Sequence, residues 1–94
     1  LAFRKKYALK GEEFYTVQLA AYSYRLPANT FGSLTNNLSV IKGNDGNYKY
    51  IYGKYNDVFE AKTAMDKIDK NIYPDAFMRI IKDGREGKII RMRD

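Results

Sequence analysis

The sequence contains no cysteine and no histidine. Without cysteine, the chain can form neither a disulfide nor a thiolate metal site. Without histidine, it lacks the commonest general base and the commonest metal ligand of proteins. No stretch approaches the roughly 20 apolar residues that a membrane-spanning helix requires. We therefore expect no metal, no cofactor and no membrane span in this chain.

Catalysis would have to rest on carboxylates and lysines, and their placement does not favour it. Acidic residues fall at Glu12 and Glu13, on predicted helix positions, and in the turn at 83–86. None of them pairs with another across a predicted cleft, as acid/base catalysis requires. The glycines of "KDGREG" follow a strand and do not open a helix, so they make a poor phosphate loop. The sequence predicts a protein that is not an enzyme.

What is present points to one folded domain. The chain has 94 residues, of which 45% are hydrophobic, with nine tyrosines and five phenylalanines, a composition typical of a single globular domain. Its net charge of +6 favours an anionic partner such as nucleic acid, an acidic polysaccharide or a membrane surface. The sequence starts at Leu1 without a methionine and shows no signal peptide. We expect a fragment or processed form, so the sequence leaves open whether a targeting signal lies upstream.

Hydrophobic periodicity predicts an alternation of strands and helices. The expected strands are "FYTVQLAAY" (14–22), 39–42, 48–52 and "AFMRII" (76–81), with the third strand ending at Gly53. A short first helix is expected after Pro27, because Phe31, Leu34 and Leu38 form one stripe. A second helix is expected from Asp57, where Asp57 and Glu60 make a capping pattern. Its apolar stripe of Val58, Ala61, Met65 and Ile68 should be buried against Val17, Leu19 and Met78.

This order predicts an α+β fold of the βαββαβ type, with a four-stranded antiparallel sheet. Both helices would cover one face of the sheet, and the other face would be open to solvent. The segment "IIRM" would add an extra C-terminal β-arm. We expect a linker or N-terminal tail at 1–13, the domain at 14–82, and a C-terminal turn with a short β-arm at 83–94.

Strand alternation assigns side chains to the two faces. The helix-covered face should hold Tyr15, Val17, Leu19, Tyr50, Tyr52, Ala76, Met78 and Ile80. The open face should hold Gln18, Lys49, Ile51, Phe77 and Arg79, and alternation along the first strand places Ala20 on the Gln18 side. In the opposite register, Tyr48, Tyr50 and Tyr52 would face a ligand and Lys49 would point inward. Burial of an unpaired lysine is costly, which disfavours that register.

Three stretches in this order carry a resemblance to a known family. They are "YTVQLAAY" (15–22), "YKYIYGKYNDVFEAKTAMDKI" (48–68) and "PDAFMRI" (74–80). Together they resemble the SPOR domain, a bacterial sporulation-related repeat, over roughly residues 14–82. The resemblance implies a βαββαβ fold that binds peptidoglycan glycan strands denuded of stem peptides. It also implies a targeting module of a larger protein in the bacterial cell envelope, in the periplasm and often at sites of cell division.

The resemblance also implies positions for the binding site. The glutamine of the family's first strand falls on Gln18, and the small polar position that follows falls on Ala21, which lacks a hydroxyl. The basic position of the third strand falls on Lys49, and the apolar contact of the last strand falls on Phe77. Lys49 would meet the lactyl carboxylate of the muramic sugar. With their neighbours on the open face, the expected glycan-binding residues are Gln18, Ala21, Lys49, Ile51, Phe77 and Arg79.

Two alternatives have the same element order. An RNA-recognition motif also has an aromatic third strand before a helix, and "YKYIYGKY" loosely matches it. That motif needs a basic residue followed by glycine at the start of the strand, whereas Gly53 comes at the end. The second alternative is a protein-interaction module of the same fold. Protein partners would then be reached through the parent protein, and nucleic acid is the less favoured ligand.

Overall fold

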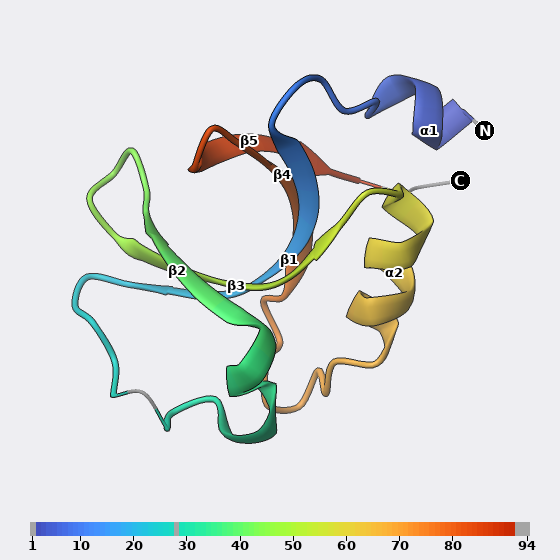
Figure 1. Cartoon of the computed structure of the whole chain (residues 1–94). Helices are drawn as coiled ribbons and strands as arrows, with labels where there is room; N and C mark the ends of the chain where they lie inside the picture. Colours follow the sequence, from blue (N-terminus) through green and yellow to red (C-terminus); the bar gives the residue numbers. More distant parts are fainter. Residues whose placement is uncertain (1, 28, 92–94) are drawn as a thin grey trace.

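The computed structural model describes residues 2–27 and 29–91, and Figure 1 shows its arrangement. The elements in chain order are α1 (Ala2–Lys6), β1 (Glu13–Tyr22), the 3-10 helix η1 (Gly32–Asn37), β2 (Leu38–Lys42), β3 (Tyr48–Tyr55), α2 (Val58–Asp66), β4 (Phe77–Lys82) and β5 (Arg85–Ile90). Within the residues so described, no helix is long and apolar enough to cross a membrane.

The strands form one five-stranded sheet in the order β2-β3-β1-β4-β5, and every neighbouring pair is antiparallel. The predicted α+β class and antiparallel sheet are confirmed. The strand count is not, because the expected C-terminal arm pairs with β4 along its length and becomes the fifth strand. That arm begins at Arg85, earlier than predicted.

The first predicted helix is short, as expected, but it is wound more tightly than an α-helix. In place of α-helix, residues Gly32–Asn37 form a 3-10 helix, and the Thr35 hydroxyl donates to the Gly32 carbonyl over 2.6 Å. Glycine and asparagine have low α-helix propensity, which explains why the stripe of Phe31 and Leu34 does not extend into a full α-helix. Both side chains still pack on the face that α2 covers.

The core lies between α2, η1 and one face of the sheet. The buried residues of two adjoining clusters are Tyr7, Tyr15, Val58, Ala61, Met78, Ile80 and Ile90, and Val17, Leu19, Phe31, Tyr50 and Ile68. The predicted burial of Val58, Ala61 and Ile68 on the helix side is confirmed. Met65 is half-buried and packs against both clusters.

Segments outside the expected domain also reach this core. Tyr7 is 4% exposed, and Ile90 packs in the same cluster. The Tyr7 hydroxyl accepts a hydrogen bond from the Arg91 amide over 3.1 Å. Arg4 of α1 donates to the Asp57 carboxylate at the start of α2 over 2.7 Å. The division at residues 13 and 82 stays a prediction, although the packing in this structure continues across both positions.

A bulge in β3 extends that strand past Gly53, so the prediction that the strand ends there is wrong. Tyr15 pairs with Tyr55 and Val17 with Tyr52, which leaves one extra residue on β3. Gly53 has a φ of +77° at this bulge, a conformation that L side chains rarely adopt. The Thr16 hydroxyl lies 2.6 Å from the Gly53 carbonyl oxygen and bonds it across the irregularity.

A second bulge, in β1, changes which residues share a face. Between the pairs Gln18–Ile51 and Ala20–Tyr50, β1 carries one more residue than β3. Ala20 therefore packs on the helix side with the core cluster, and its expected place beside Gln18 is wrong. Ala21 pairs with Lys49 and so returns to the Gln18 face. Simple alternation over β1 would have separated Ala21 from Gln18.

The sheet curls strongly, so that its two edges approach each other. The backbone amide of Asn44, in the turn between β2 and β3, donates to Glu86 Oε1 on β5 over 2.7 Å. β2 and β5 are the two edge strands, at opposite ends of the strand order. In Figure 1 the green β2–β3 turn and the red β4–β5 hairpin lie beside each other at the same end of the sheet. The face opposite α2 is therefore concave.

Candidate functional site

We call the sheet face opposite α2 the inner face, and define it by Gln18, Ala21, Lys49, Ile51, Phe77 and Arg79. Gln18 lies between Ile51 of β3 and Phe77 of β4, which pair with it on either side. Ala21 pairs with Lys49, and Arg79 pairs with Thr16. The structure thus brings together on one face all the residues predicted to bind a ligand.

The expectation that this face is open to solvent is wrong. Gln18 is 5% exposed, Lys49 8%, Ile51 2% and Arg79 7%. Ala21 is exposed and Phe77 is half-buried. The cause is the curl of the sheet, which places Glu86 of β5 and the turn at 43–47 over the middle of the inner face.

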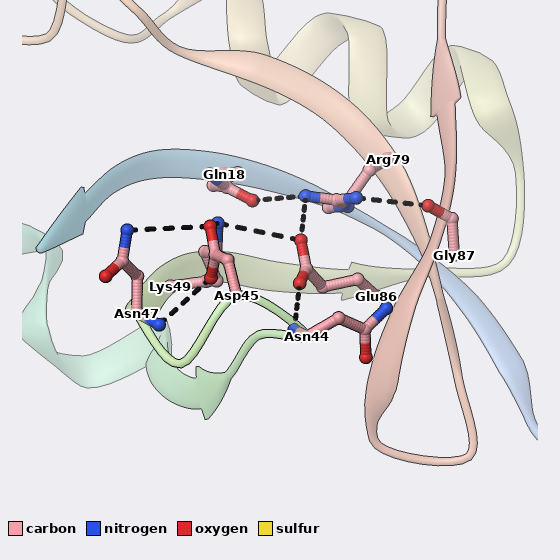
Figure 2. Close-up of polar contacts among 8 residues, drawn as sticks. All are labelled: Gln18, Asn44, Asp45, Asn47, Lys49, Arg79, Glu86 and Gly87. Atoms are coloured by element: carbon pink, nitrogen blue, oxygen red, sulfur yellow. Dashed lines mark hydrogen bonds and ion pairs between the residues drawn. The ribbon is translucent and has the colours of Figure 1, made fainter. Parts of the chain in front are cut away.

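Arg79 is the centre of a buried polar cluster (Figure 2). Its Nη1 donates to Gln18 Oε1 over 2.7 Å and lies 3.0 Å from Glu86 Oε2. Its Nη2 donates to the Gly87 carbonyl over 3.1 Å. Its Nε is buried and has no hydrogen-bond partner in the described part of the chain. The guanidinium on β4 therefore bonds residues of β1 and β5, and its Nε remains without a partner among the described residues.

Glu86 and Lys49 extend this cluster toward the β2–β3 turn. Lys49 Nζ lies 3.7 Å from Glu86 Oε2 and 3.0 Å from Asp45 Oδ2. The pKa of the Asp45 carboxyl lies below its usual range because the Asn47 backbone amide donates to it and because Lys49 bonds it. Lys49 was expected to be an exposed cation. It is buried instead, since paired charges can be accommodated where an unpaired one cannot.

A groove opens beside this cluster, where β1 ends and the segment leading into β4 begins. Its volume is about 580 Å³, and its lining includes Gln18, Ala21, Tyr22, Pro74, Asp75 and Phe77. Arg79 lies under the Phe77 ring, with its Cζ 5.5 Å from the ring centroid. Gln18 is thus shared: it lines the groove and bonds the buried Arg79. At its other side the groove is lined by Leu19, Ala20, Phe31 and Tyr73, which belong to the helix-side cluster. The groove therefore lies at the end of the sheet, where the accessible part of the inner face meets the helix side.

The tyrosines of β3 do not face this groove. Tyr50 is 6% exposed and stacks on Phe31 with ring centroids 4.9 Å apart. Tyr48 and Tyr52 pack against the same helix-side cluster. The register in which these rings face a ligand and Lys49 alone points inward is therefore wrong. Stacked nucleic-acid bases would have required that register.

Sequence reasoning missed Glu86, Asp45 and Tyr22. Glu86 could have been found from the Asp83–Gly84 pair, because a two-residue Asp-Gly turn fixes the hairpin register. In that register Lys82 pairs with Arg85 and Ile81 with Glu86, which puts Glu86 on the Arg79 side. Asp45 and Tyr22 had no such local signal. Among the described residues no group of histidine, cysteine, aspartate and glutamate could hold a metal ion.

The chain matches a known protein family over most of its length. The model of the SPOR domain family matches residues 11–79, which include Gln18, Lys49 and Phe77. No curated protein and no solved structure matches the chain. SPOR domains are binding domains, not catalytic ones; they bind peptidoglycan and occur in proteins of the bacterial cell envelope and of cell division. Since the match covers most of the sequence, the chain belongs to the SPOR domain family.

Proposed function

We propose that this SPOR domain binds peptidoglycan glycan strands from which the stem peptides have been removed, and that it targets a larger envelope protein to them, on the periplasmic side. The observation that carries the proposal is that Gln18, Ala21 and Phe77 line one groove. The resemblance to the family points to the same three residues.

The chemistry of the groove suits a sugar chain. The Gln18 amide can both donate and accept hydrogen bonds, as a hydroxyl-rich ligand requires. The half-buried Phe77 ring can stack on the apolar face of a sugar ring. The small side chain of Ala21, which is exposed, leaves room for that ring to approach the strand. Tyr22, 38% exposed, adds a second aromatic wall.

The buried part of the inner face would supply two cations, Lys49 and Arg79, to bind an anionic group of the glycan. Removal of a stem peptide from a glycan leaves a carboxylate on the lactyl group of each muramic sugar. Lys49 and Arg79 lie on the same face as Gln18, and Arg79 bonds it directly. A carboxylate that entered beside Gln18 would meet these cations through charge-assisted hydrogen bonds.

The test is cosedimentation with purified sacculi, with and without amidase treatment that removes the stem peptides. The proposal predicts that the domain sediments with treated sacculi and much less with untreated ones. A folded Phe59→Ala variant is the control, because Phe59 lies on α2, on the other side of the sheet. Equal sedimentation with both preparations would contradict the proposed preference for denuded strands.

A further inference from the structure

The Glu86 carboxylate is held as a bound anion would be held. Oε2 lies 3.0 Å from Arg79 Nη1 and 3.7 Å from Lys49 Nζ. Oε1 accepts from the Asn44 backbone amide over 2.7 Å. A guanidinium, an ammonium and a backbone N–H converging on one carboxylate form a complete carboxylate-binding site.

This carboxylate comes from outside the part of the chain that the family model describes. The match ends at residue 79, and Glu86 stands on β5, Arg85–Ile90. Lys49 and Gln18 both lie inside the matched residues. Both cations thus lie inside the matched residues, as does Asp45, which pairs with Lys49. Glu86, the carboxylate that pairs with both Lys49 and Arg79, is added by the hairpin that follows the match.

The backbone of the β2–β3 turn lies close against the Glu86 carboxylate. A Cβ placed on Gly43 would collide with Glu86 Oε1 and with Lys49 Cε. Gly43 therefore allows the turn to approach the carboxylate closely enough for the Asn44 amide to bond it. The Glu86 side chain is 13% exposed, and those of Arg79 and Lys49 are 8% and 10% exposed. Water competes weakly for charges that are buried to this degree.

We propose that Glu86 is an internal substitute for the ligand carboxylate, and that the lactyl carboxylate of a denuded glycan displaces it to bind Arg79, Lys49 and the Asn44 amide. This inference rests on the proposed function. It adds that competition between the lactyl carboxylate and Glu86 sets the affinity of the domain for the glycan. One carboxylate replaces another, so the buried cations stay neutralised throughout the exchange. Release of Glu86 frees the inner face next to Gln18, which lines the adjoining groove.

The principal variant is Glu86→Gln, which keeps the shape of the side chain and removes the competing charge. Its matched control is Glu60→Gln, which changes the net charge equally at an exposed position on α2. Circular dichroism checks that each variant folds. Affinity is measured for solubilised denuded glycan strands, for strands with stem peptides intact, and for denuded strands whose carboxylates have been converted to methylamides.

Glu86→Gln is expected to bind denuded strands about tenfold more tightly than the parent, because the internal competitor no longer closes the site. Glu60→Gln should match the parent. The methylamide strands should show no gain. A gain confined to strands with intact stem peptides would assign the carboxylate to those peptides and overturn the lactyl assignment.

If the parent and Glu86→Gln bind denuded strands equally, the inference is overturned and the proposed function stands. If neither binds, the proposed function fails, and a monosaccharide titration settles the carboxylate site separately. N-acetylmuramic acid, which carries the lactyl group, is compared by NMR with N-acetylglucosamine, which does not. Shifts of the Lys49 and Arg79 side chains with the first sugar only, and larger in Glu86→Gln than in Glu60→Gln, support the site. Absence of those shifts overturns it.

Discussion

The Arg79 guanidinium on β4 donates a hydrogen bond to Gln18 Oε1 on β1 over 2.7 Å. This bond joins the accessible groove to the buried charge cluster, because Gln18 belongs to both. Any ligand that competes for the Gln18 amide must therefore also perturb Arg79. In the proposed function, the groove and the cluster are the open half and the closed half of one site.

Arg79→Lys tests whether the guanidinium geometry matters. An ammonium presents its donors from a single nitrogen, so it does not reproduce the planar fork with which Arg79 bonds Gln18 and Glu86 through Nη1 and the Gly87 carbonyl through Nη2. We expect the free energy of unfolding to fall by about 1–3 kcal/mol in urea titrations, as for buried polar groups that lose partners. Arg85→Lys, at an exposed position of β5, is the control and should change stability little. Equal losses in the two variants would contradict the role assigned to Arg79.

The core assignment predicts a difference between two methionines. Met78 is 2% exposed, whereas Met65 is half-buried between the two clusters. Met78→Ala should lower the free energy of unfolding by about 2–5 kcal/mol, and Met65→Ala should lower it by less. Thermal and urea melts measure both values. A larger loss for Met65→Ala would place the centre of the core nearer to α2 than the structure has it.

The bulge in β3 predicts a difference between two glycines. Gly53 and Gly46 both have positive φ, +77° and +84°, so alanine is strained at each. A Cβ at Gly53 would also collide with the Tyr55 ring, whereas a Cβ at Gly46 would meet nothing. Gly46→Ala should cost about 1–2 kcal/mol, and Gly53→Ala should cost more. Equal costs in urea melts would show that Tyr55 moves aside freely.

The Asp45 carboxyl predicts a pH effect. Its pKa is lowered from an ordinary value of 3.8 by the Asn47 amide first and then by Lys49. Its contribution to stability is therefore complete above the unfolded pKa and is lost as pH falls through the lower folded pKa. Lys49→Met should raise the Asp45 pKa measured by NMR titration, yet leave it below 3.8, because the Asn47 amide remains. An unchanged pKa would mean that Lys49 does not bond Asp45 in solution.

Much of the fold could be predicted from the sequence because its periodic signals are local. The stripe of Val58, Ala61 and Ile68 and the alternation of Tyr15, Val17 and Leu19 both predicted the buried face. The two bulges in β1 and β3 could not be predicted, since no local pattern fixes where a strand carries an extra residue. The resemblance to the family nevertheless placed Ala21 beside Gln18, which alternation alone would not have done.

The burial of the inner face could not be predicted for a different reason. It depends on a contact between Asn44, in the turn that follows β2, and Glu86 on β5. β2 and β5 lie at opposite edges of the sheet. The curl that joins them is a sum of strand twist and bulges over the whole sheet. Lys49 was therefore assigned to the correct face but with the wrong exposure.

The central proposal is that the groove binds glycan, and it can be tested directly. The measurement is the affinity of the parent and of folded Gln18→Ala, Phe77→Ala and Phe59→Ala variants for denuded sacculi, by cosedimentation over a range of sacculus concentrations. Gln18→Ala and Phe77→Ala are each expected to weaken binding by about tenfold, equivalent to roughly 1.4 kcal/mol, and Phe59→Ala is expected to bind as the parent does. Parent-like binding by both groove variants, with loss of binding in Phe59→Ala, would contradict the proposal and place the ligand on the helix side of the sheet.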